Sequence, residues 1–108
     1  MNSLTIIAFM DDWQISARLA TFSNTFSYEL FFYDNRFKIC EIDAKKILII
    51  DIDYFDEQHF INLNLSAEKD IIFILGYSTN LNKKHITELK NLGYDMIMNR
   101  KNLFNNLN

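Results

Sequence analysis

The sequence predicts an α/β fold in which a doubly wound, five-stranded parallel sheet carries helices on both faces. Short apolar runs recur along the 108 residues, and most are separated by stretches whose apolar residues have helical spacing. An alternation of strands and helices with short connections is typical of such sheets. In addition, Ile47 to Ile50 form a continuous apolar run that ends on Asp51 and Asp53. This pattern indicates a strand buried on both faces.

The first third of the chain supplies two strands and the helix between them. Leu4–Met10 is mostly apolar and precedes Asp11 and Asp12, so we expect the first strand there. The next apolar residues follow one stripe of a helix, and these are Ile15, Leu19, Phe22 and Phe26. Asp11 or Asp12 can cap the start of this helix. Glu29–Tyr33 is the expected second strand.

The middle of the chain is harder to interpret. Residues 36–45 fit a short helix or a loose strand equally well. The third strand is the apolar run that ends at Asp51. Phe55–Ala67 mixes apolar and polar residues in a way that favours a helix, and Asp70–Leu75 is the fourth strand, bounded by Gly76.

A helix and a strand complete the predicted sheet. Ser78, Thr79 or Asn80 offers an N-cap for a helix that ends at Gly93. Tyr94–Met98 is the expected fifth strand. Residues 101–108 hold enough apolar side chains for about two helical turns.

Composition and charge limit the class of protein. The length and the 49% hydrophobic content fit one domain over residues 1–108 without an output domain. A net charge of −3 gives no basic face for nucleic acid. The lone Cys40 cannot form an internal disulfide and is expected to be a small buried residue, which fits the cytoplasm. We expect neither a secretion signal nor a membrane-spanning segment, which needs roughly 20 apolar residues.

Acids follow two of the expected strands. The carboxyl ends of parallel strands share one edge of a sheet, so we expect Asp11, Asp12 and Asp51 to converge there. Converging carboxylates repel one another, so a cation is expected among them, and oxygen ligands suit Mg²⁺. The three acids are therefore the candidate metal ligands.

The same edge could carry out phosphoryl transfer. A carboxylate such as Asp51 can attack phosphorus and form an aspartyl-phosphate. A hydroxyl and a cation must then hold the phosphoryl oxygens. Ser78 or Thr79 would supply the hydroxyl, and Arg100 or Lys101 would supply the cation.

The order of these residues resembles the receiver domain of two-component response regulators, a CheY-like domain of flavodoxin-like fold, over essentially the whole chain. Asp11-Asp12 matches the metal-binding pair of that family, and Asp51 matches its phosphoacceptor. Gly93-Tyr-Asp-Met-Ile-Met-Asn-Arg100 matches its Gly-Ala-x-x-Tyr-x-x-Lys, which places Arg100 at the lysine position.

The chain also departs from that family. Counting back from Gly93 places Ser78 at the Ser/Thr switch position, whereas the predicted strand end would place Gly76 there. The family carries Lys-Pro after its fifth strand, and this chain has no proline. Arg100 keeps the positive charge, but its guanidinium fork differs from an ammonium group.

The resemblance implies a stand-alone receiver of a two-component or phosphorelay system, not a turnover enzyme. Asp51 would accept a phosphoryl group with Mg²⁺, and the domain would signal through protein–protein contacts. The expected partners are a histidine kinase or phosphotransfer protein and a downstream protein, without nucleic acid or membrane, and a homodimer stays open.

Two other hypotheses stay open. The first is a pseudo-receiver, a phosphorylation-independent interaction module with Tyr94, Phe104 and the Lys83/Lys84 helix as its surface. The second, a small flavodoxin-like enzyme or nucleotide binder, is disfavoured because Asp11-Asp12-Trp13 stands where a Gly-rich phosphate loop would lie.

Overall fold

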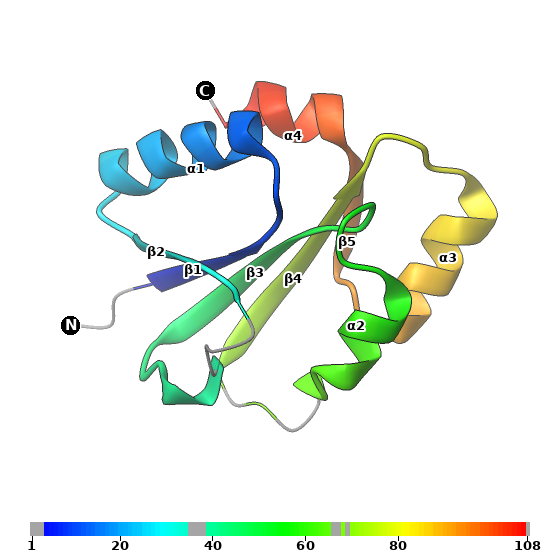
Figure 1. The fold of residues 1–108 in the computed structure, drawn as a ribbon, viewed down its shortest axis with the longest axis horizontal. Coiled ribbons are helices and arrows are strands. Elements are labelled where there is room, and N and C mark those ends of the chain that lie inside the picture. The colour runs from blue at the N-terminus through cyan, green and yellow to red at the C-terminus, as the bar shows by residue number, and fades with distance from the viewer. Residues whose placement is uncertain (1–3, 35–38, 66–67, 69, 108) are drawn as a thin grey trace.

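A five-stranded, all-parallel sheet forms the middle layer of the molecule in a computed structural model (Figure 1), which describes residues 4–34, 39–65, 68 and 70–107. The strands are β1 (Leu4–Phe9), β2 (Glu29–Phe32), β3 (Lys45–Asp51), β4 (Ile71–Ser78) and β5 (Met96–Asn99). Their order across the sheet is β2-β1-β3-β4-β5. The helices are α1 (Trp13–Thr25), the short 3₁₀ helix η1 (Ile39–Glu41), α2 (Glu57–Asn62), α3 (Lys83–Leu92) and α4 (Arg100–Asn106). The predicted α/β fold, with the strand order of a flavodoxin-like sheet, is confirmed.

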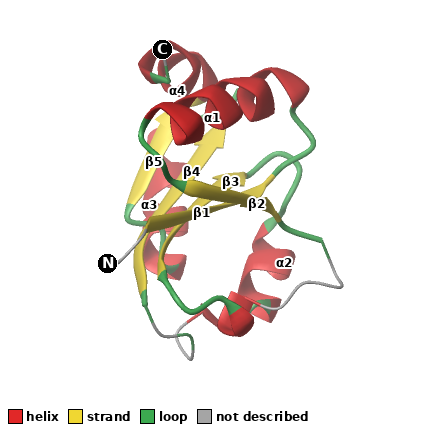
Figure 2. Ribbon diagram, turned by 90° about the vertical axis from the view of Figure 1, so that its left-hand side faces the viewer, coloured by secondary structure: helices red, strands yellow, loops and turns green. Residues whose placement is uncertain are grey.

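Helices cover both faces of this sheet. Figures 1 and 2 show α1 and α4 on one face and α2 and α3 on the other. Because side chains alternate along a strand, each central strand contributes to two separate cores. On the α1/α4 face the buried cluster is Ile6, Ala8, Ile15, Leu19, Ile49, Leu75, Tyr77, Leu103 and Leu107. On the α2/α3 face it is Ile7, Phe9, Ile39, Leu48, Ile50, Ile52, Phe55, Phe60, Ile74, Leu89 and Tyr94.

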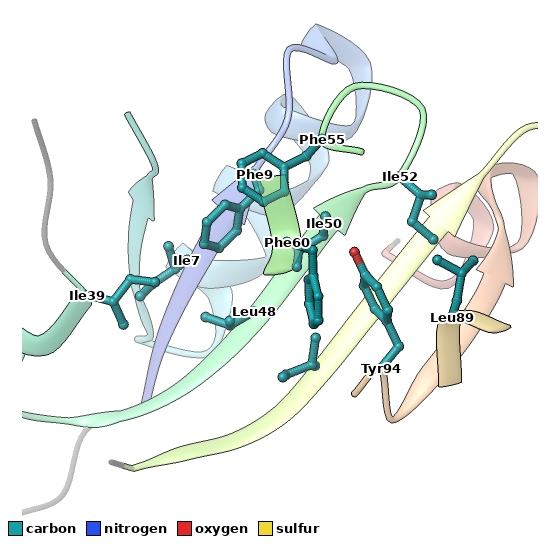
Figure 3. Close-up of a cluster of buried hydrophobic side chains, with 11 residues drawn as sticks. Ile7, Phe9, Ile39, Leu48, Ile50, Ile52, Phe55, Phe60, Leu89 and Tyr94 are labelled. Carbon is teal, nitrogen blue, oxygen red and sulfur yellow. The ribbon is translucent and has the colours of Figure 1, made fainter. Parts of the chain in front are cut away.

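Gly76 lies inside β4 and does not bound it, so the predicted end of this strand at Leu75 is wrong by three residues. The reason is packing. A Cβ on Gly76 would lie 2.6 Å from Cδ1 of Ile52 and 2.8 Å from Cε1 of Tyr94. Figure 3 shows Ile52 and the Tyr94 ring in the core on the α2/α3 face. The glycine therefore makes room for a close contact where the sequence suggested a turn.

The N-cap of α3 also differs from the prediction. Asn82, rather than Ser78, Thr79 or Asn80, accepts the backbone N–H of His85 at 2.8 Å. Ser78 still belongs to β4, so the helix begins later. Gly93 ends α3 as expected, with φ at +130°.

Other boundaries shift by a few residues. Asp56 caps α2, which ends at Asn62, so the helix is shorter than the predicted 55–67, of which residues 66–67 lie outside the described part. The 36–45 stretch contains η1, while residues 35–38 and the side chain of Cys40 lie outside the described part. Within the described residues, no helix combines the length and the apolar character that crossing a membrane requires.

Candidate functional site

The carboxyl edge of the sheet gathers polar residues from four strand ends. Asp12 lies between β1 and α1, Asp51 ends β3, Ser78 ends β4, and Arg100 begins α4 directly after β5. All five strands are parallel, so these ends share one edge as the sequence predicted. The clearest evidence that these strand ends meet is an ion pair between Asp12 and Arg100, which lie 88 residues apart in the chain.

Asp12 is the hydrogen-bonding centre of this edge. Its Oδ1 accepts the backbone N–H of Ile15 at 3.2 Å and Nη2 of Arg100 at 2.9 Å. Its Oδ2 accepts Nε of Arg100 at 2.8 Å and the hydroxyl of Tyr77 at 3.0 Å. An ionised carboxylate offers about four accepting positions. These donors occupy all of them, and the bond to Ile15 is the N-cap of α1.

The surroundings of Asp12 favour its charged form. The hydrogen bonds from Arg100 lower the pKa of the Asp12 carboxyl below its ordinary value. Partial burial acts in the opposite direction, while the bonds from Ile15 and Tyr77 add to the lowering. Asp12 therefore carries its negative charge at neutral pH, and Arg100 neutralises it locally.

Arg100 is held by more than this ion pair. Its Nη2 also donates to Oε1 of Gln14 at 2.9 Å, and its guanidinium lies 5.8 Å from the ring centroid of Phe104. The Arg100 side chain is only 26% exposed. Lys101 is exposed, and its described hydrogen bond is the backbone one to Oδ1 of Asn99. Arg100 is thus the cation that reaches the acids.

Asp51 lies at the carboxyl end of the central strand and is half-buried. Its Oδ1 accepts the backbone N–H of Asp53 at 3.0 Å. Burial raises the pKa of the Asp51 carboxyl, and the negative charges of Asp53 and Asp12 raise it further, against the lowering effect of backbone N–H groups. Asp51 therefore faces negative neighbours, as the sequence predicted for this edge.

Ser78 and Thr79 turn toward Asp53. The Ser78 hydroxyl donates to Oδ1 of Asp53 at 2.6 Å, and the backbone N–H and hydroxyl of Thr79 each donate to Oδ2 at 3.0 Å. Burial raises the pKa of Asp53, but these hydrogen bonds outweigh it and hold that pKa below its ordinary value. The hydroxyl assigned from sequence to the phosphoryl group therefore ties the end of β4 to the loop after β3.

Tyr77 is the residue that the sequence reasoning missed. It pairs with Asp51 in the β3–β4 register, its side chain is 1% exposed, and its hydroxyl reaches Asp12. Burial raises the pKa of the Tyr77 hydroxyl, as do the charges of Asp51 and Asp12, so it stays a hydrogen-bond donor. A tyrosine directly before the expected site residue Ser78, at the end of an apolar run, was the available signal.

The predicted metal site is not assembled around Asp12. In this arrangement Asp12 has no accepting position left for a metal, while Asp11 is exposed. Within the described residues no group of three or more His, Cys, Asp or Glu side chains is placed to hold a metal ion. The oxygen chemistry suits Mg²⁺, but the occupancy of Asp12 does not fit it. Mg²⁺ binding by Asp11, Asp12 and Asp51, predicted from the sequence, would require one of these donors to leave Asp12.

Comparison with known proteins adds no family. Neither a scan against protein-family models nor a search of curated proteins finds a match for this chain. The functional interpretation therefore depends on the fold and on the geometry of the carboxyl edge.

Proposed function

We propose that the chain is a receiver-like signalling domain in which Asp51 accepts a phosphoryl group. The observation that carries the proposal is that the Asp51 carboxylate, at the end of the central strand, keeps hydrogen-bond accepting capacity. Its described hydrogen-bond donors are backbone N–H groups, which leave accepting capacity on the carboxylate. Asp12, in contrast, has its accepting positions filled.

The position of Asp51 supports the same role. In open α/β sheets, ligands bind beyond the carboxyl ends of the strands, and Asp51 ends the middle strand of this sheet. Arg100 supplies a positive charge at the same edge, and the charge of Asp51 contributes to raising the pKa of Arg100. A phosphoryl group on Asp51 would therefore add negative charge at an edge that already holds a cation.

The transfer step forms one bond to phosphorus and breaks another. A carboxylate oxygen of Asp51 attacks the phosphorus of a phosphohistidine, a P–O bond forms, and the P–N bond of the donor breaks. The imidazole nitrogen keeps the electron pair and takes a proton. Asp51 must be ionised to attack, so its raised pKa makes transfer slower at acidic pH.

The proposal implies protein partners. A histidine kinase or phosphotransfer protein would supply the phosphoryl group in the cytoplasm, and a downstream protein would recognise the modified domain. The domain receives one phosphoryl group and does not turn over a substrate. The modification would add negative charge beside Asp12, Asp53 and the start of α4, which gives a local change for a partner to recognise.

A pseudo-receiver is the second candidate, and one observation favours it. Arg100 and Tyr77 already satisfy Asp12, so the charge of this acid is compensated without a metal. Its expected surface needs one correction. Tyr94 is 4% exposed and stacks on Phe60 with ring centroids 4.4 Å apart, so it is core and not surface.

Phosphoryl transfer from a small donor separates the two candidates. The protein is incubated with acetyl phosphate, with and without Mg²⁺, and its intact mass is measured. We expect one added phosphoryl group in the wild type and in Asp53→Asn, and none in Asp51→Asn. Asp53→Asn is the matched control, because it removes an acid two residues away. No addition to the wild type under either condition would reject the phosphoacceptor and favour the pseudo-receiver.

A further inference from the structure

The Arg100 guanidinium binds Asp12, one of the two acids that the resemblance assigns to metal binding. We propose that Arg100 is the resident cation of this edge and that it excludes a divalent metal from Asp12. This inference does not depend on phosphorylation of Asp51. It depends on which donors occupy the carboxylate of Asp12.

The first support is the complete use of the Asp12 oxygens. Two nitrogens of Arg100, one backbone N–H and one tyrosine hydroxyl fill about four accepting positions. A metal ion binds the same lone pairs, so it must first break one of these bonds. The Asp12 side chain is only 12% exposed, which leaves little of it for a water-mediated contact.

The second support is that Arg100 is held in place before any ligand arrives. The bond to Gln14 fixes one guanidinium nitrogen, and the Phe104 ring lies beside the guanidinium. Arginine is well suited to this role because its planar fork matches both oxygens of a carboxylate and keeps its charge at any ordinary pH. A lysine would present a single charged point and would leave more of the carboxylate open.

The third support is the place of Arg100 in the chain. It is the first residue of α4, and Leu103 within that helix and Leu107 just after it are buried in the α1/α4 core. This packing holds the backbone of Arg100, so the side chain is the part that has to move when Asp12 is released.

Magnesium titration of the full chain tests this inference. Trp13 is the only tryptophan, follows Asp12 directly and is 78% exposed, so its fluorescence reports on this edge. Calorimetry gives the dissociation constant independently. We expect Arg100→Gln to bind Mg²⁺ at least about tenfold more tightly than the wild type, because Asp12 is released. Lys101→Gln is the matched control, since it removes the same charge one residue later and should bind like the wild type.

Two outcomes would overturn the inference. One is equal Mg²⁺ affinity of the wild type and Arg100→Gln, whether both bind or neither does. The other is a gain in Mg²⁺ affinity in Arg100→Gln that persists when Asp12→Asn is added, since the metal would then not bind to Asp12.

A measurement on the wild type keeps the test valid if Arg100→Gln does not fold. The Nε–H signal of Arg100 in ¹H–¹⁵N NMR spectra should stay in place through Mg²⁺ additions in the millimolar range. Loss or displacement of that signal in step with Trp13 fluorescence would show that the metal removes Arg100 from Asp12. That result would reject the proposal without bearing on phosphorylation of Asp51.

Discussion

The ion pair between Asp12 and Arg100 should contribute measurably to folding, and a double-mutant cycle can isolate its coupling energy. The cycle uses Asp12→Asn, Arg100→Gln and the double variant. Asparagine keeps an oxygen that can cap α1, so the cap largely cancels from the comparison. The lost contact between Arg100 and Gln14 occurs in both arms and cancels too.

The structure sets the expected size of the coupling. Exposed ion pairs contribute about 0.2–1 kcal/mol, and breaking a buried pair costs about 3–5 kcal/mol. The two side chains are 26% and 12% exposed and are joined by two short, charge-assisted bonds. We therefore expect a coupling of about 1–3 kcal/mol, measured by urea denaturation at neutral pH.

The pH dependence gives a second check on the same pair. Arg100 lowers the pKa of Asp12 in the folded state. The pair therefore contributes its full stability above 3.8, the ordinary pKa of an aspartate, and loses it as the pH falls through the lower folded value. A coupling below about 0.5 kcal/mol, or one that does not change between about pH 7 and about pH 3, would refute the reasoning.

Three further predictions concern stability. Gly76→Ala should cost about 1–3 kcal/mol in chemical denaturation, because its Cβ would overlap Tyr94 and Ile52; an unchanged midpoint would contradict the packing. Asp51→Asn should raise the melting temperature at neutral pH. Burial and the neighbouring acids raise the pKa of Asp51, so its negative charge destabilises the folded protein above that pKa. The gain in melting temperature should vanish in acid, where Asp51 is protonated in both the folded and the unfolded protein. Asn82→Ala should cost about 1 kcal/mol by losing the α3 cap, and the matched control Asn80→Ala should stay within about 0.5 kcal/mol; equal costs would place the cap elsewhere.

The sheet could be predicted because a strand that is buried on both faces needs apolar residues at consecutive positions. β3 has a strand on each side and helices on both faces, so Ile47 to Ile50 are apolar without interruption. The stripe through Ile15 and Leu19 predicted α1 in the same way, since both side chains are fully buried. Parallel strands then required Asp12, Asp51 and Arg100 to share an edge.

Gly76 and the α3 cap could not be predicted from local sequence. A glycine in an apolar run indicates either a turn or a close contact, and the contacts that decide, with Ile52 and Tyr94, come from distant segments. Several residues between Ser78 and Asn82 can cap a helix. Ser78 and Thr79 bind Asp53 instead, which sequence spacing does not reveal.

The partners within the site depended on side-chain reach. Sequence reasoning brought Asp11, Asp12 and Asp51 together around a metal, but it had no means of placing the guanidinium of Arg100 on both oxygens of Asp12. Tyr77 was missed because a tyrosine in a buried strand is ordinarily core. Its ring does pack in the core, and only its hydroxyl extends to the acid.

We propose that Asp51 is the phosphoacceptor, and chemical marking of the modified residue tests this role most directly. Borohydride reduces an aspartyl-phosphate to homoserine, so peptide mass spectrometry of acetyl phosphate-treated, reduced protein locates the acceptor. We predict homoserine at position 51 and at no other aspartate. Homoserine at position 11, 12 or 53, or none anywhere in the chain, would contradict the claim.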